Sequence, residues 1–226
     1  FYSGSSVFTT GTTTADTKGA FSFTPSYAIS DGTYSVKAQA TDAAGNVSAK
    51  SSSLSITIDT TAPDAPTSLT NISDTNDSTP TISGNAEANS TVTIFIDSST
   101  LGTTTADTKG AFSFTPSSAI SDGTYSITAT ATDAAGNVSS KSASLSITID
   151  TTGPEVPSSL TFTTDANDNT PTLTGKAEAN STVTLLNGDI VVGTTTADSE
   201  GNFSITLATE LEDGNYSLTA KTTDSA

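Results

Sequence analysis

Apolar residues alternate with serine and threonine along much of the chain. The pattern is visible at residues 54–58 (LSITI), at residues 111–114 (AFSF) and, over a longer stretch, at residues 125–131 (YSITATA). A period of two places successive side chains on opposite faces of an extended strand, so that one face is buried and the other is solvated. The chain is therefore predicted to consist of half-buried β-strands, and no helical periodicity competes with this interpretation.

Turn-forming residues separate these runs. Within residues 59–149 we expect strands at about 68–72, 80–84, 91–96, 101–105, 111–115, 124–132 and 138–149. The Asp-Gly pairs at 31–32 and 122–123 are assigned to turns, where Asp caps the local backbone and Gly tolerates unusual dihedral angles. About seven short strands with turns every ten residues or so are typical of an antiparallel sandwich of the immunoglobulin type. Phe112, Phe114 and Tyr125 stand at strand spacing and are expected in its core.

The chain repeats itself with a period of 91 residues. Residues 11–61 recur at 102–152 with six differences, and a looser third copy keeps the same offset. Such a period indicates a tandem array. We expect an all-β chain of tandem immunoglobulin-like β-sandwiches in an extended array. Its domains are predicted at residues 1–58, which lack their first strands, at 59–149, which form a complete repeat, and at 150–226, which are truncated near the last strand.

Composition excludes several kinds of chemistry. The chain has 226 residues, 24 Asp plus Glu against 7 Lys plus Arg, a formal net charge of -17, and no Cys, His, Met or Trp. Without Cys and His there is no zinc site of the usual nitrogen and sulfur type, no Ser-His-Asp or Cys-His nucleophile, and no disulfide. An acidic surface repels nucleic acid and anionic lipid headgroups but attracts hard divalent cations. We predict no catalytic function and no nucleic-acid partner.

The ends of the chain carry their own expectation. The first residue is not Met, and residues 1–10 enter the repeat after its start, so we expect a piece of a longer protein. No apolar run approaches the roughly 20 residues that span a bilayer, so no membrane insertion is expected of this piece.

Several motifs follow one another in the same order in each repeat. In the middle repeat they are DTTAPDAP at 59–66, PTISG at 80–84, ADTKGAFS at 106–113, DGTYS at 122–126 and TDAAGN at 132–137. Over essentially its whole length the chain resembles the bacterial immunoglobulin-like repeats that build the stalks of giant secreted adhesins and biofilm-associated surface proteins. The resemblance implies export, often by a type I route, to the bacterial cell surface. It also implies calcium ions at the domain junctions and an adhesive module elsewhere in the protein.

The expected topology also points to calcium. In a sandwich with this strand order, the incoming linker and three loops lie at one pole, and that pole gathers acidic residues. The candidate ligands are Asp59, Asp64, Glu87, Asp107 and Asp133 in the middle repeat, and Asp150, Glu155, Glu178, Asp198 and Asp224 in the third. The loop at the opposite pole adds Asp74, Asn76 and Asp77, or Asp165, Asn167 and Asp168. Because calcium takes about 6 to 8 oxygen ligands, we predict a Ca²⁺ cofactor at each junction. The alternative is that these residues cap turns, as Asp and Asn commonly do.

The function expected from the sequence is mechanical. A sandwich copied almost verbatim serves reach and stiffness, whereas a catalytic site is normally needed once. We expect an extracellular stalk segment, stiffened by calcium, whose partners are the neighbouring repeats of the same chain and whose adhesive ligand is unknown. Two alternatives stay open: a surface-layer or filament subunit that associates laterally through exposed edge strands, or an accessory region of a secreted enzyme.

Overall fold

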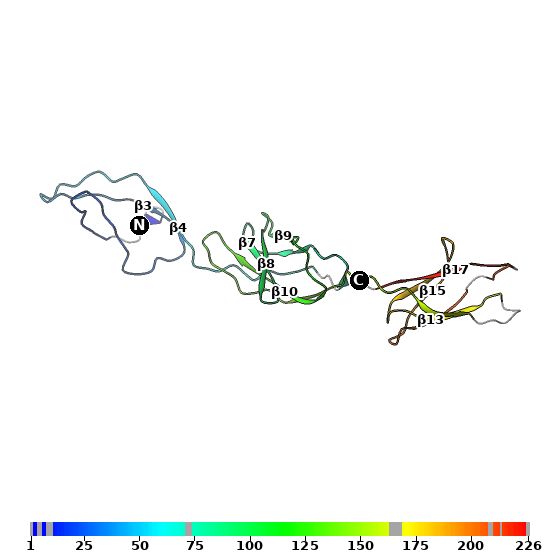
Figure 1. Ribbon diagram of the computed structural model, residues 1–226. Coiled ribbons are helices and arrows are strands. Elements are labelled where there is room, and N and C mark those ends of the chain that lie inside the picture. Colours follow the sequence, from blue (N-terminus) through cyan, green and yellow to red (C-terminus); the bar gives the residue numbers. More distant parts are fainter. Residues whose placement is uncertain are drawn as a thin grey trace.

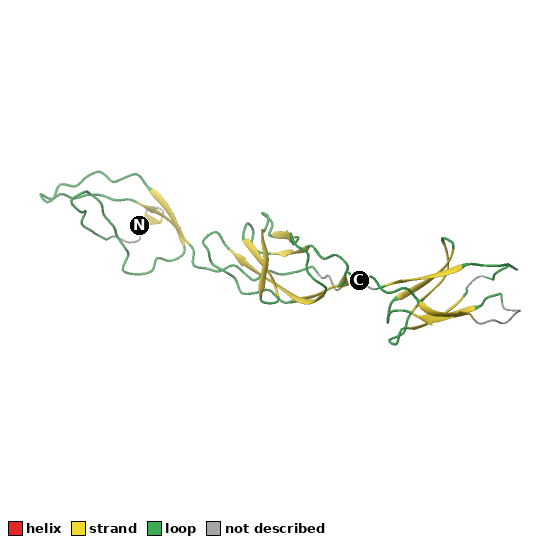
Figure 2. Ribbon diagram, in the orientation of Figure 1, coloured by secondary structure: helices red, strands yellow, loops and turns green. Residues whose placement is uncertain are grey.

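The computed structural model describes residues 2–3, 6–7, 11–70, 74–162, 169–207, 210–212 and 214–224. These residues form strands β1 to β17, and none of them lies in a helix (Figure 2). The strands fall into three units that follow one another in a row (Figure 1). The all-β prediction is confirmed. Among the described residues, no helix has the length and apolar character needed to cross a membrane.

The middle unit is a sandwich of two sheets. Its strands are β5 (Asp74–Thr75), β6 (Ile82–Asn85), β7 (Thr91–Ile96), β8 (Ser99–Thr105), β9 (Ala111–Phe114), β10 (Gly123–Thr132) and β11 (Leu145–Ile149). One sheet has the order β5-β11-β10-β7-β8, and the other pairs β6 with β9. A backbone bridge between Thr67 and Asn85 adds the first segment of the unit to the β6–β9 sheet. This arrangement is the immunoglobulin-type sandwich that the sequence predicts.

The core of the middle unit lies between the two sheets. Ile82 from one sheet and Val92, Ile94, Ile127 and Ile147 from the other are fully buried there. Phe112 is also buried, and Phe114 and Tyr125 pack against the same cluster, so the expected core role of the three aromatic residues is confirmed. The strand alternation places these residues on the inner faces. On the outer face of β10, Thr124 is exposed, whereas Thr130 is also buried.

The third unit repeats the sandwich. Its strands are β12 (Ser158–Phe162), β13 (Thr172–Lys176), β14 (Thr182–Asn187), β15 (Ile190–Thr196), β16 (Asn202–Thr206) and β17 (Leu218–Thr223). They form the sheets β12-β13-β16 and β15-β14-β17. A second core cluster between these sheets contains Leu173, Val183, Leu185, Phe203 and Ile205.

The first unit differs from the middle unit although its sequence is nearly the same. Its strands are β1 (Tyr2–Ser3), β2 (Ser6–Val7), β3 (Gly32–Val36) and β4 (Leu54–Ile58), which form one sheet of order β2-β1-β3-β4. Phe21 is 62% exposed, whereas its counterpart Phe112 is 4% exposed. The order β2-β1-β3-β4 corresponds to β8-β7-β10-β11 of the middle unit, but the described residues of the first unit form no counterpart of the β6–β9 sheet, to which Phe112 belongs.

A tyrosine fixes the corner before the long strand of each unit. The Tyr34 hydroxyl donates to the Ser30 carbonyl at 2.8 Å, and Tyr125 and Tyr216 make the same bond four residues back. This bond is the tyrosine corner of immunoglobulin-type sandwiches. The preceding glycine is required because Gly123 has a φ of 152° and a Cβ there would lie 3.2 Å from the Tyr125 hydroxyl. The corner explains the recurring Asp-Gly-x-Tyr motif.

Two expected strands are shorter than the sequence predicts. Only Leu145–Ile149 of the expected last strand is regular, because serine hydroxyls replace part of the backbone ladder before it. Ser139 Oγ accepts the Ala131 N–H at 2.9 Å, and Ser142 Oγ accepts the Ala129 N–H at 3.0 Å. The chain therefore follows β10 without the extended geometry of a strand.

The expected first strand at 68–72 is not regular over residues 68–70, and residues 71 and 72 lie outside the described residues. Thr70 donates its N–H to the Ser83 carbonyl at 2.8 Å on the β6–β9 side. A few residues later, β5 pairs in parallel with β11 in the other sheet. The segment thus passes from one sheet to the other, a change that alternation within one run of residues cannot show.

Candidate functional site

The linker after the first unit is held by a turn of that unit. Thr60 donates its backbone N–H to Asp31 Oδ1 at 3.0 Å and its hydroxyl to the same oxygen at 2.8 Å. The Thr61 hydroxyl donates to Asp31 Oδ2 at 2.7 Å, and the Thr61 N–H donates to Asp59 Oδ1 at 3.1 Å. Both carboxylate oxygens of Asp31 are thus used to hold the first two threonines of the linker.

The second junction has the same arrangement. Thr151 donates its N–H and its hydroxyl to Asp122 Oδ1 at 3.1 and 2.8 Å, and the Thr152 hydroxyl donates to Asp122 Oδ2 at 2.9 Å. The register of the sheet explains why Asp122 lies close to Thr151 and Thr152, because Gly123 of β10 pairs with Ile149 of β11. The residue before Gly123 therefore lies beside the residues after Ile149. We call these contacts, of Asp31 with Thr60 and Thr61 and of Asp122 with Thr151 and Thr152, the linker clamps.

The linker clamps do not follow from local sequence patterns. Asp31 and Asp122 lie in turns, as predicted, but nothing near them in the sequence indicates a partner for their carboxylates outside the turn. A signal was available, since in both copies an Asp-Gly pair is followed 29 residues later by the Thr-Thr pair. Finding it requires the pairing of β10 with β11, which is a tertiary contact.

The following unit also holds each linker. Asn137 Nδ2, in the loop after β10, donates to the Asp59 carbonyl at 3.1 Å. The Asp133 carboxylate orients Asn137, because it accepts the Asn137 backbone N–H at 2.9 Å and the Asn137 Nδ2 at 2.8 Å. At the second junction the Thr222 hydroxyl, near the end of β17, donates to the Glu155 carbonyl at 2.7 Å. Each linker is thus bonded to the unit before it and to the unit after it.

Hydrogen bonds lower the pKa of several of these carboxyl groups. The pKa of Asp31 lies below the usual range because the Thr61 and Thr60 hydroxyls bond to the charged form. The pKa of Asp122 is lowered by Thr151 first and then by Thr152. Bonds from Asn137 lower the pKa of Asp133. Asp31 and Asp122 are exposed, and Asp133 is half-buried.

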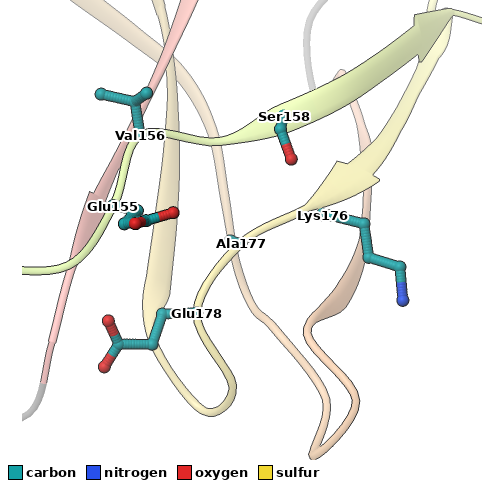
Figure 3. Close-up of a pocket in the computed structure, with 6 residues that line it drawn as sticks. All are labelled: Glu155, Val156, Ser158, Lys176, Ala177 and Glu178. Carbon is teal, nitrogen blue, oxygen red and sulfur yellow. The ribbon is translucent and has the colours of Figure 1, made fainter.

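Four of the predicted metal ligands line two depressions, two in each. Asp64 on the linker and Glu87 in the loop after β6 line one depression at the first junction. Glu155 and Glu178, their counterparts in the third repeat, line the equivalent depression at the second junction. Figure 3 shows Glu155 above Glu178, with Lys176 pointing away from both. The Lys176 Nζ donates to the Glu200 carbonyl at 3.2 Å.

Three other predicted ligands cap their own turns. Asp107 Oδ1 accepts the N–H groups of Lys109 and Ala111 at 2.8 and 2.9 Å. Asp198 Oδ1 accepts those of Glu200 and Asn202 at 2.9 and 2.8 Å. Asp133 caps its turn in the same way, through Ala135 and Asn137. Asp150 Oδ1 accepts the Thr152 N–H at 3.1 Å, and Asp224 directly follows β17.

The predicted ligands of the opposite pole lie where β5 meets the next linker. Asp74 belongs to β5, Asn76 follows it, and the Asp150 N–H donates to the Thr75 carbonyl at 3.0 Å. Asp77 Oδ1 accepts both the N–H and the hydroxyl of Thr79 at 2.8 and 3.0 Å. The third-repeat counterparts, Asp165, Asn167 and Asp168, fall outside the described residues.

Comparison with known proteins decides the family. The model of the bacterial Ig-like domain matches the chain three times, at residues 4–60, 64–151 and 162–226. The chain belongs to this bacterial Ig-like domain family. The resemblance inferred from the motifs is thereby confirmed. No curated protein matches the chain.

Solved structures with similarity to this chain of bacterial Ig-like domains come from several kinds of protein. A tetra-tandem repeat in the extending region of a large adhesion protein is 29% identical, with a TM-score of 0.37, over 86% of this chain and 53% of that one. The BSP domain of a biofilm-associated protein is 26% identical, with a TM-score of 0.27, over 70% of this chain and 27% of that one. A β-glucuronidase of Bacteroides uniformis is 14% identical, with a TM-score of 0.30, over 69% of this chain and 23% of that one. The chain thus spans about half of the first of these proteins and about a quarter of the others.

The described acidic residues of these bacterial Ig-like domains form no cluster of three carboxylates. Among the described residues, no group of three Asp or Glu side chains lies close enough to hold a metal ion together. Two carboxylates line each depression, Asp64 and Glu87 at the first junction and Glu155 and Glu178 at the second. A pair of carboxylates together with backbone carbonyls has the hard oxygen chemistry that calcium accepts, although it supplies few of the 6 to 8 ligands. Calcium binding stays a prediction.

Proposed function

We propose that this chain is a spacer segment of a bacterial surface adhesin, which holds an adhesive part of the protein away from the cell. The observation that carries the proposal is the double attachment of each linker. At the first junction, Asp31 holds Thr60 and Thr61 from one side, and Asn137 holds the Asp59 carbonyl from the other. We propose domain boundaries near Asp59 and Asp150, at the residues that these contacts hold.

The linker clamps act by limiting the torsional freedom of the linker. A free linker of a few residues samples many backbone conformations, and each bond to a rigid sandwich removes some of them. Because the Asp122 bonds hold the first residues after β11, the chain leaves the middle unit in one direction. The acidic units also repel one another, and this repulsion favours an extended array over a folded-back one.

The proposed role is non-catalytic and extracellular, and its direct partners are the neighbouring repeats. Support comes from the family and from the repetition of the same acids and the same clamp at successive junctions. A ligand-binding or catalytic centre is normally needed once, whereas a device that sets the orientation of neighbours is needed at each junction.

A test of the spacer uses distances between units. The chain has no Cys, so Ser118→Cys and Thr196→Cys give two defined spin labels on the middle and third units. Pulsed electron resonance is expected to show a narrow distance distribution, which Asp122→Ala broadens. Asp189→Ala is the matched control, since it removes the same charge from an exposed hairpin turn. Equal widths for the two variants, or a wild-type distribution as broad as that of Asp122→Ala, would contradict the spacer mechanism.

We propose further that calcium binds at the paired carboxylates. Asp64 and Glu87 at the first junction, and Glu155 and Glu178 at the second, come from a linker and from a loop of the following unit. Neutralising their mutual repulsion draws the linker toward that unit and adds stability by preferential binding to the folded form. Asp31 and Asp122 hold the linkers from the preceding unit through hydrogen bonds, without a metal.

Calorimetric titration of metal-free protein tests the calcium proposal. Calcium is expected to bind at millimolar concentration or below, with magnesium as the control. Glu87→Gln and Glu178→Gln together are expected to abolish the heat, whereas Glu210→Gln, which removes a charge elsewhere, leaves it unchanged. No heat with calcium in the wild type would assign these acids to an ordinary solvated surface, and the spacer would then depend on the linker clamps alone.

Lateral association is a second candidate, and one observation favours it. The strand β15 lies at a sheet edge, and its first residues Ile190 and Val191 are 69% and 56% exposed. The middle repeat has Ser99 and Thr100 at these positions. Exposed apolar edges favour pairing with another strand. Light scattering at rising concentration tests this, and Ile190→Ser with Val191→Thr is expected to abolish any association.

A further inference from the structure

The two linkers contact the middle unit at opposite ends of its longest strand (Figure 1). Asn137, in the loop after β10, donates to the Asp59 carbonyl at 3.1 Å. Asp122, directly before β10, accepts the Thr151 and Thr152 hydroxyls at 2.8 and 2.9 Å. Strand β10 has ten residues, so its length of about 30 Å separates the two contacts. A pull on the two linkers is therefore directed along the strands of this unit.

The strands next to the two linkers, β5 and β11, are paired in parallel. Ile149 pairs with Thr75, and the Asp150 N–H donates to the Thr75 carbonyl at 3.0 Å. Because both strands run in the same direction, tension on the incoming linker draws β5 backward while tension on the outgoing linker draws β11 forward. The two strands can separate only by sliding past each other. Hydrogen bonds between strands lie across this direction, so they are loaded together and not one after another.

The segment before β5 makes a second contact of this kind, with β6. The Thr67 N–H donates to the Asn85 carbonyl at 2.8 Å, and the Asn85 N–H donates to the Thr67 carbonyl at 2.9 Å. The Thr70 N–H donates to the Ser83 carbonyl at 2.8 Å. Strand β6 is itself paired with β9 along its whole length. In the third unit β12 and β13 pair at the equivalent position. The incoming chain is thus attached along the direction of the pull to both sheets of the middle unit.

We propose that the middle unit is built to carry load. The β5–β11 pair and the bridge between Thr67 and Asn85 form a shear clamp, which keeps the unit folded while its linkers are pulled apart. The proposal rests on the proposed spacer role, because a spacer that holds an adhesive part away from the cell transmits any pull on that part. Unfolding replaces the unit with extended chain of up to about 3.5 Å per residue, so the shear clamp also preserves the length of the spacer.

Constant-force measurements on the whole chain test the shear clamp. The chain has no Cys, so Ala62→Cys and Gly153→Cys, at equivalent positions of the two linkers, attach handles to the middle unit alone. Ala62 is exposed, and a Cβ on Gly153 would have no atom within 4 Å. Thr75→Pro removes a backbone N–H from β5. It is expected to shorten the lifetime under force about fivefold, the factor that corresponds to the loss of one hydrogen bond.

Ile94→Val is the matched control for Thr75→Pro. Ile94 is fully buried in β7, outside the shear clamp, and loss of its methylene costs about as much stability as loss of one hydrogen bond. Urea unfolding is expected to show a similar loss of stability in both variants, whereas the lifetime under force of Ile94→Val stays close to that of wild type. An equal shortening of the lifetime in the two variants would overturn the proposal, as would a wild-type lifetime for Thr75→Pro.

A second pair of handles leaves the sequence of β5 intact and decides the matter if Thr75→Pro does not fold. Asn76→Cys with Gly153→Cys applies the force after β5, so that β5 no longer lies between the handles. At the same force the lifetime is expected to be at least about fivefold shorter than with the handle at residue 62. Equal lifetimes for the two pairs of handles would overturn the shear clamp. They would leave the spacer role standing, since that role is tested by the width of the distance distribution between units.

Discussion

Replacing Phe112 by alanine, and separately Phe21, is the same change in two copies of the same sequence. Both residues lie in the segment GAFSFTP, but Phe112 is 4% exposed and Phe21 is 62% exposed. In the middle unit the Phe112 ring lies on Gly84 of β6, since a Cβ on that glycine would be 2.8 Å from the ring. The pair of variants therefore separates the effect of the neighbours from that of the sequence.

The expected magnitudes differ severalfold. Truncating a buried phenylalanine to alanine costs about 3 to 5 kcal/mol, because apolar contact is lost and a cavity is left. Phe21 has most of its surface in water in either state, so its truncation is expected to cost less than about 1 kcal/mol. A domain of this size has a free energy of unfolding of roughly 5 to 15 kcal/mol. Phe112→Ala thus removes a large share of the stability of the middle unit and lowers its melting temperature by at least about 12 °C.

The assay must report each unit by itself. Differential scanning calorimetry resolves the transitions, and hydrogen exchange assigns them through fragments that contain Ser118 in the middle unit or Tyr27 in the first. Phe112→Ala is expected to shift only the transition of the middle unit. Equal effects of the two variants on their own units would refute the reasoning, since burial by β6 and β7 would then not be the source of stability.

Three further predictions concern the turns and the linker clamp. Gly110→Ala is expected to lower the free energy of unfolding, measured by chemical denaturation, by about 2 to 4 kcal/mol, because φ is +89° and a Cβ would lie 2.5 Å from the Ala86 carbonyl. Gly136 has a similar φ but no atom within 4 Å of its Cβ position, so Gly136→Ala should lower it by only about 1 kcal/mol. Tyr125→Phe should destabilise its unit by about 0.5 to 1.5 kcal/mol through loss of the corner hydrogen bond. An unchanged free energy of unfolding would show that this bond does not stabilise the unit. The pKa of Asp122 is lower in the folded state than in the unfolded state, so between these two pKa values the unfolded chain binds more protons. The stability that this group contributes is therefore present above about pH 5 and is lost as pH falls through the folded-state pKa. Urea unfolding from pH 7 to 2.5 should therefore show a difference in free energy of unfolding between wild type and Asp122→Asn that is constant above about pH 5 and shrinks below it. A difference that grows on acidification would contradict the lowered pKa.

Local patterns were sufficient for the strands that form within one run of residues. The alternation at 91–96 predicts β7 with its observed bounds, and the runs at 111–115 and 124–132 predict β9 and β10 within one residue. Alternation was not sufficient where the chain changes partner. The segment around Thr70 leaves one sheet for the other, and Ser139 and Ser142 replace strand backbone with hydroxyl groups, so neither element shows a simple period of two.

The candidate site divides in the same way. Linker and loop positions follow from strand order, so the sequence predicts Asp64, Glu87 and their third-repeat counterparts at one pole. In the structure Asp64 and Glu87 line one depression, and Glu155 and Glu178 line another. It does not reveal that Asp122 holds Thr151 and Thr152. That contact depends on the register of β10 against β11, which joins residues 29 positions apart.

By itself the sequence determines the repeat, the β-strands, the acidic surface and the order of the turns, since each of these is a property of neighbouring residues. Tertiary structure alone decides which apolar side chains are buried. Phe21 and Phe112 have the same neighbours in the chain, yet one is exposed and the other is buried. The reason is that burial of a half-buried strand requires a second sheet, and the strands that cover Phe112 come from another part of the chain.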